Sequence, residues 1–190
     1  MQEVLIVMRA NYFILLLLWL GGQQYSYGQF HTARIQATGL TCALCSKAIY
    51  ESLEKLSPVE KVTADIKSST FSIQFKKEAA VNPDELKAAV EDAGFFVGGL
   101  ELEGEWPTGL PNSSTPFQLG GNWYQVLSGK ANKGKSSFTI SVIDKGFVTA
   151  KAYKKFLSQF SGPTFSTGYF GADGSSPDQK QRLIHVLIIK

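Results

Sequence analysis

The chain has 190 residues and a formal net charge of +3, so it has room for one domain of ordinary size or two small ones. A hydrophobic content of 44% is that of a globular protein and excludes a disordered chain. We find no Ser/His/Asp set, no phosphate-binding glycine loop and no paired acids in a suitable context, so the motifs favour no class of enzyme.

Residues 1–28 have the pattern of a secretory signal peptide. Arg9 precedes the apolar run 13–20, and small residues ending at Gly28 follow it. The run is shorter than the roughly 20 apolar residues that span a bilayer. We therefore expect cleavage after Gly28 and a secreted, periplasmic protein. An uncleaved membrane anchor is the alternative, and a start at Met8 instead of Met1 stays open.

Residues 29–103 follow the order strand, helix, strand, strand, helix, strand. Alternating apolar positions predict the strands, and apolar spacing of three and four residues predicts the helices. The strands are expected at 32–38, 62–66, 71–75 and 95–102, and the helices at 45–56 and 82–93. Asn82 and Pro83 supply a cap and a first helical residue. The order predicts an α+β, ferredoxin-like βαββαβ domain, with two helices on one face of a four-stranded antiparallel sheet.

The two cysteines, Cys42 and Cys45, stand where the first strand gives way to the first helix. Unpaired N–H groups at a helix N-terminus stabilise a thiolate over a thiol. Soft sulfur selects Cu(I) and similar ions over Mg(II) or Ca(II), whereas structural Zn(II) needs four ligands. A disulfide closing so short a loop would add little stability. We predict that the pair binds a soft metal ion, with Cu(I) as the expected one.

The stretch Gly39-Leu40-Thr41-Cys42-Ala43-Leu44-Cys45, the helix after it and the closing Ala93-Gly94-Phe95 resemble the heavy-metal-associated domain over residues 31–103. That family includes copper chaperones, amino-terminal modules of copper-transporting ATPases and the periplasmic mercury-binding protein. The resemblance implies Cys42 and Cys45 as ligands. It places Leu40 beneath the loop, where the family usually has methionine, and Phe95 beside it; Thr41 matches the copper and mercury members. The implied partner is another metal-transfer protein or a membrane metal transporter.

Other functions fit parts of the same pattern. A thiol–disulfide oxidoreductase also places C-x-x-C at a strand-to-helix turn, but the tryptophan expected just before the first cysteine is missing. Hg(II) would suit the same two sulfurs. The chain could also be an adaptor, in which the second half recognises a ligand and the first half only anchors or senses. Export argues against a nucleic-acid partner.

The rest of the chain is predicted to be a linker, 104–116, rich in Pro, Gly and Ser, and a small β-rich α+β domain, 117–190. Strands are expected at 123–127 and 138–143, joined by a basic hairpin loop, followed by a helix at 149–160, an irregular stretch at 161–178 and a central strand at 183–189. His185 in that last strand is expected to be a satisfied core histidine.

The two halves differ in charge. Residues 106–190 carry 10 Lys and Arg against 3 Asp and Glu, while residues 29–104 carry 8 against 11. Opposite signs could let the halves dock on each other. The basic half could instead meet an anionic membrane surface or an acidic partner.

Overall fold

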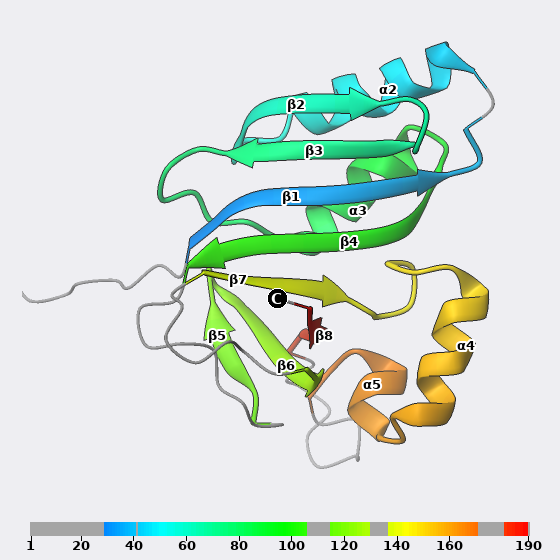
Figure 1. Ribbon diagram of the computed structural model, residues 1–190. Coiled ribbons are helices and arrows are strands. Elements are labelled where there is room, and N and C mark those ends of the chain that lie inside the picture. Colours follow the sequence, from blue (N-terminus) through cyan, green and yellow to red (C-terminus); the bar gives the residue numbers. More distant parts are fainter. Residues whose placement is uncertain (1–28, 41, 106–114, 130–136, 171–180, 190) are drawn as a thin grey trace, which may run out of the picture.

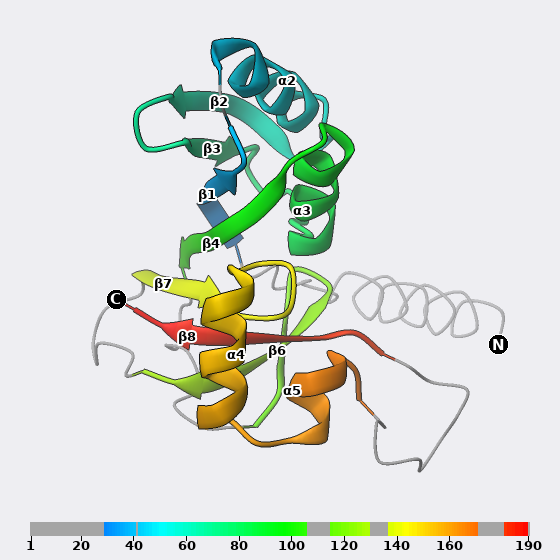
Figure 2. The same cartoon turned by 90° about the vertical axis from the view of Figure 1, so that its right-hand side faces the viewer.

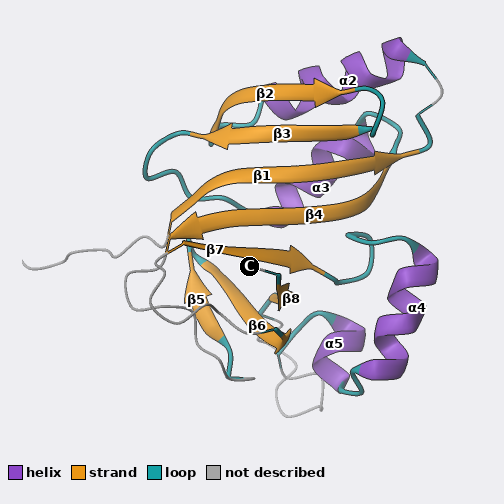
Figure 3. Ribbon diagram, viewed as in Figure 1, coloured by secondary structure: helices purple, strands orange, loops and turns teal. Residues whose placement is uncertain are grey.

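The computed structural model describes residues 29–40, 42–105, 115–129, 137–170 and 181–189. Figures 1 and 3 show their strands and helices, which follow one another in this order: β1 (Gln29–Thr38), α2 (Ala43–Glu54), β2 (Val59–Asp65), β3 (Thr70–Phe75), α3 (Pro83–Asp92), β4 (Phe96–Glu105), β5 (Phe117–Leu119), β6 (Asn122–Ser128), β7 (Ser137–Val142), α4 (Ala150–Gln159), α5 (Pro163–Thr167) and β8 (Leu183–Ile188). Within these ranges no helix is long and apolar enough to cross a bilayer.

The first half is a ferredoxin-like βαββαβ unit, as predicted. Its strands lie in the order β2-β3-β1-β4, and each neighbouring pair is antiparallel. Figure 2 shows α2 and α3 together on one face of these strands. Apolar residues from both layers form the core between them, among them Ile35, Ile49, Leu53, Ile73, Leu86, Val90 and Leu100. Asn82 caps α3 as expected, since its side chain accepts a hydrogen bond of 3.0 Å from the Asp84 N–H.

The sheet does not end with the ferredoxin-like unit. β4 also pairs antiparallel with β7, from Leu100 opposite Val142 to Glu105 opposite Ser137. The strand order then continues β7-β8-β6-β5, which gives one sheet of eight strands across the described residues. The separate β-rich domain that we predicted is therefore not confirmed, because its strands extend the sheet of the first half.

The predicted hairpin between the strands at 123–127 and 138–143 is wrong. β8 lies between β6 and β7, parallel to β6 and antiparallel to β7. Four consecutive residues of β8, from Leu183 to Val186, are buried, so this strand is suited to the central position that we predicted for it. The stretch predicted to be irregular contains the short helix α5. The predicted signal peptide, and most of the predicted linker and basic loop, lie outside the described residues, at 1–28, 106–114 and 130–136.

A charged network joins the two halves beside the sheet. Arg182, just before β8, binds Asp84 at the start of α3 with Nε and Oδ2 2.9 Å apart. The same guanidinium binds the buried Asp144, with Nη1 and Oδ2 2.8 Å apart. Opposite charges allowed the two halves to dock, and this ion pair between an arginine and an aspartate 98 residues apart is a contact of that kind.

His185 is buried in the core, as expected, but only one of its ring nitrogens has a protein partner. Nδ1 lies 2.8 Å from Asp144 Oδ1, while the buried Nε2 has none. The ring of Phe165 from α5 packs edge-on against the imidazole, with the centroids 5.2 Å apart. The expectation of a satisfied histidine therefore holds for Nδ1 alone.

Candidate metal site

The two cysteines come together at the N-terminus of α2. Cys42 is the N-cap residue, with extended backbone angles of −153° and 166°, and Cys45 follows in the first turn. The N–H of Cys45 donates to the carbonyl oxygen of Cys42 over 3.1 Å, which closes that turn. The two Sγ atoms lie 3.0 Å apart, longer than a disulfide bond of about 2.05 Å. The structure thus brings the predicted ligands together as two thiols that are not crosslinked.

Gly39 makes the turn that carries the chain from β1 to the cysteines. Its φ of +88° lies in the left-handed region that favours glycine. A Cβ at this position would lie 4.0 Å from Cδ1 of Phe95, an ordinary contact, so the requirement for glycine comes from the backbone angle and not from crowding. This turn is the local reason why the pattern changes from strand to helix here.

The family resemblance implied that Leu40, Thr41 and Phe95 lie next to the two cysteines. Leu40 and Phe95 are both half-buried and pack against the hydrophobic core. Phe95 also lies next to Gly39, so its ring borders the cysteine loop. Thr41 lies outside the described residues. Leu40 and Phe95 therefore lie on the core side of the loop, while Cys42 is exposed.

Within the described residues, no third His, Cys, Asp or Glu side chain joins the two sulfurs. No group of three or more His, Cys, Asp and Glu side chains in these ranges is arranged to hold a metal ion. His31 lies near the opposite end of β1, where its Nε2 is 3.8 Å from Oε2 of Glu105. Two thiolates suit a soft ion of low coordination number. With metal–sulfur bonds of about 2.3 Å, an ion midway between two sulfurs would hold them about 4.6 Å apart, so the thiols must separate when they bind it.

The side chain of Cys42 has room to move away from that of Cys45. Cys42 is exposed and Cys45 is half-buried. Cys42 also makes no side-chain capping hydrogen bond. The site is therefore open to an approaching ligand, chiefly on the side of Cys42.

Three strongly exposed apolar side chains lie at the same end of the molecule as the cysteines. They are Leu44, Phe96 and Ile66, which are 76%, 70% and 60% exposed, and we call them the apolar rim. Leu44 stands between the cysteines, Phe96 pairs with Thr38 at the end of β1, and Ile66 is in the turn between β2 and β3. Figure 1 shows that turn, the start of β4 and the start of α2 at one end of the sheet.

Sequence reasoning missed the apolar rim. Leu44 belonged to the motif, but Phe96 and Ile66 carry no signal of their own, because a single apolar residue at a strand end or in a turn is normal in any soluble domain. A hint was available in Phe95-Phe96, since only one of two adjacent strand residues can face the core. Exposed apolar residues gathered around a site mark a surface that meets another molecule.

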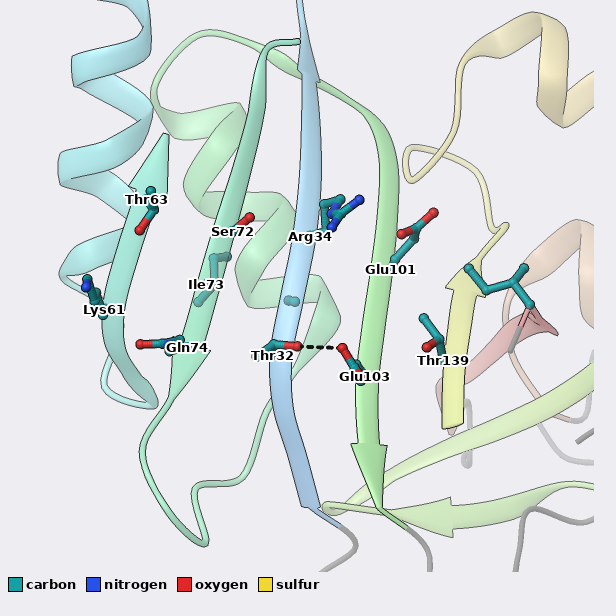
Figure 4. A pocket seen from close by; sticks show the side chains of 12 residues that line it. Thr32, Arg34, Lys61, Thr63, Ser72, Ile73, Gln74, Glu101, Glu103 and Thr139 are labelled. Atoms are coloured by element: carbon teal, nitrogen blue, oxygen red, sulfur yellow. Dashed lines mark hydrogen bonds between the residues drawn. The ribbon is translucent and has the colours of Figure 1, made fainter. Parts of the chain in front are cut away.

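The open face of the sheet carries a separate cavity of about 600 Å³ (Figure 4). Side chains from β1, β2, β3, β4 and β7 line it, most of them polar, and Thr32 Oγ1 donates to Glu103 Oε2 over 3.3 Å. Arg34 and Lys61 face the same hollow as Glu101 and Glu103, so charges of both signs are mixed there. Neither cysteine lines this cavity, so it is no part of the candidate metal site.

The model of the heavy-metal-associated domain family matches residues 34–96. Copper-transporting ATPase 2 of Homo sapiens is 31% identical over 68 residues, which are 36% of this chain and 5% of that protein. A "Probable copper-exporting P-type ATPase" of Archaeoglobus fulgidus is 33% identical over 63 residues, 33% of this chain and 8% of that protein. The matched segment is thus a small part of either relative.

Among solved structures, the yeast copper transporter domain Ccc2a, studied in apo and Cu(I)-loaded states, is 26% identical. The match covers 34% of this chain and 88% of that domain, with a TM-score of 0.31. The family match lies within residues 31–103, where the motifs had indicated the same domain. That resemblance is confirmed, and the second half of the chain lies outside it.

Proposed function

Since residues 34–96 form a heavy-metal-associated domain, we propose that this protein binds Cu(I) through Cys42 and Cys45 and passes it to another protein. The observation that carries the proposal is the pair of sulfurs, 3.0 Å apart on an open surface, with no third suitable donor among the described residues. A site of this kind can hold a soft ion and can also release it. The named relatives that transport copper favour copper over other soft ions.

Transfer would proceed by ligand exchange. A thiolate of the partner attacks the bound Cu(I), one copper–sulfur bond forms, and one bond to this protein then breaks, so the ion passes through a three-coordinate state without changing its charge. Cys42 is more exposed than Cys45, so the partner's sulfur meets the ion on the Cys42 side. The half-buried Cys45 then holds the ion until the second exchange.

The partner in this proposal is another metal-transfer protein or a membrane metal transporter. The apolar rim favours a protein surface as the partner, because three large apolar side chains at the same end of the molecule as the sulfurs lose water when they are covered. Excluding water at that moment also keeps the shared ion among sulfur ligands.

The rim leads to a prediction about transfer. In a Leu44→Ser, Phe96→Ser double variant, we expect the second-order rate of Cu(I) transfer to a thiolate-bearing partner domain to fall about tenfold or more, because two exposed apolar contacts are lost. The affinity for Cu(I), measured against a chelator, should stay within about twofold, since the sulfurs are untouched. Stopped-flow transfer from the copper-loaded protein measures the rate.

Ile189→Ser is the matched control, because Ile189 is also exposed, at 51%, but follows β8 in the second half of the chain. Its transfer rate should equal that of the unmodified protein. Equal rates in all three proteins would show that the rim takes no part in docking.

The redox and mercury alternatives predict different measurements. A protein that uses Cys42 and Cys45 for thiol–disulfide exchange would turn over in a reductase assay and would not need Cu(I). A mercury-binding protein would keep Hg(II) in the presence of competing Cu(I). Elemental analysis of the protein purified from its own compartment decides which ion it carries.

We also propose that the protein is exported to the periplasm with removal of residues 1–28. β1 begins at Gln29 and pairs with β4 through Glu105, so a cut after Gly28 would leave the first strand whole. We therefore expect mass spectrometry of the protein from the periplasmic fraction to find Gln29 as its first residue. Recovery of the chain with residues 13–20 intact, in the membrane fraction, would instead favour the uncleaved anchor.

A further inference from the structure

The helix α4 is an amphipathic helix that lies on the surface of the second half. None of its residues is buried. Lys151, Lys154 and Lys155 are exposed, while Tyr153 and Phe156 are half-buried and Leu157 is 39% exposed. At 100° per residue the lysines occupy one side of the helix and the apolar residues the other.

Aromatic contacts with Phe165 of α5 hold α4 in place. The rings of Tyr153 and Phe160 lie 5.6 Å and 6.2 Å from the buried ring of Phe165 in α5. Phe156 stacks on Phe160 at 6.3 Å. The lysine side of α4 therefore points away from the rest of the protein, and Leu157 borders it.

The lysines of this surface have no acidic partners in the described part of the chain. We call Lys151, Lys154 and Lys155 the lysine face; all three are exposed, and none forms an ion pair with a described carboxylate. The result is a concentrated positive surface in the half of the chain that has the large excess of basic residues.

We propose that the lysine face docks on a bilayer that contains anionic lipids. Lysines close to such a surface are attracted to it, and their long apolar stems let the charged ends reach the headgroups. Leu157, at the border of the lysine side, supplies the apolar contact that an interfacial helix needs in addition to charge. A nucleic acid or an acidic protein would use the lysines and leave Leu157 without a function.

The orientation of the lysine face agrees with the proposed function. The inference that docking brings Cys42 close to a membrane rests on that function. Figure 1 shows α4 and the start of α2 on the same side of the molecule, and Figure 2 turns that side toward the viewer. Docking through α4 would therefore hold Cys42 beside the membrane, where a transporter presents its own metal-binding groups.

The test is flotation of the full chain, without metal, with vesicles of phosphatidylcholine alone or with 30% phosphatidylglycerol. We expect binding to the anionic vesicles only. A Lys151→Glu, Lys154→Glu, Lys155→Glu variant should bind them at least about tenfold more weakly. A Leu157→Ser variant, with unchanged charge, should bind several-fold more weakly.

The matched control is a Lys55→Glu, Lys61→Glu, Lys67→Glu variant, which changes the net charge by the same amount in the first half, at lysines that are also exposed. Both variants contain residues 1–28, so a difference between them reports on where the changed lysines lie and not on that segment. Equal binding by the two triple variants overturns the proposal, whether both bind like the unmodified protein or both lose binding.

Nucleic acid and acidic proteins are tested with a DNA duplex and with polyglutamate. Binding to either of these, without binding to anionic vesicles, would assign the lysine face to a soluble polyanion and overturn the proposal. Because no metal is present, a protein that fails to bind Cu(I) can still dock on vesicles, and the two proposals fail separately.

Discussion

A variant that lacks either cysteine is expected to lose tight binding of Cu(I). The site offers two sulfurs 3.0 Å apart, and no third metal donor accompanies them in the described ranges. Cys42→Ser or Cys45→Ser replaces one of two soft ligands by a hard hydroxyl. We expect a fall in affinity of about a thousandfold or more, equivalent to about 4 kcal/mol. Titration with Cu(I) against a competing chelator, under reducing conditions, measures it.

Ser46→Ala provides a control for the cysteine variants, because Ser46 is in the same turn of α2, is buried and adds no metal ligand. It should bind Cu(I) like the unmodified protein. If the Cys42→Ser, Cys45→Ser double variant binds Cu(I) as tightly as the unmodified chain, the ion is held elsewhere and the proposed function is wrong.

Replacing Arg182 is expected to have the largest effect on stability. Its guanidinium donates to Asp84 at 2.9 Å, to Asp144 at 2.8 Å and to two backbone carbonyl oxygens at 3.0 Å and 2.8 Å. Burial disfavours the charged form, but the hydrogen bonds and charges of Asp84 and Asp144 outweigh this and raise the pKa of Arg182 above its ordinary value. Arg182→Met would leave the buried Asp144 without its cation, at a cost of about 3–5 kcal/mol in the free energy of unfolding.

Urea denaturation followed by circular dichroism and by tryptophan fluorescence tests this. Trp123 lies in the second half and contributes to the fluorescence together with Trp19 and Trp106, while the dichroism reports on the helices of both halves. Because one sheet spans both halves, the two signals should change together in the unmodified protein.

Two further variants complete the stability comparison. Arg182→Lys keeps the charge but loses the planar fork, so we expect an intermediate loss. Lys47→Met removes an exposed pair with Glu51 and should cost less than about 0.5 kcal/mol. A loss below about 1 kcal/mol for Arg182→Met would mean that the network does not stabilise the contact between the halves.

The pattern of residues by itself determined most of the first half. Alternating apolar positions, the cap at Asn82 and the left-handed glycine at Gly39 act over a few residues, so the strands, helices and cysteine loop can be predicted without knowing what surrounds them. The two ligands could be predicted in the same way, because one helical turn brings residues three positions apart close together.

Only the tertiary structure decided how the two halves join. The apolar pattern of β4 shows which face is buried, but it does not show which strand pairs along its free edge, and so the pairing with β7 was missed. The insertion of β8 between β6 and β7, the apolar rim and the contact of Arg182 with Asp84 likewise depend on residues far apart in the chain. Such contacts form through packing of complete elements, and no short stretch of sequence contains both partners.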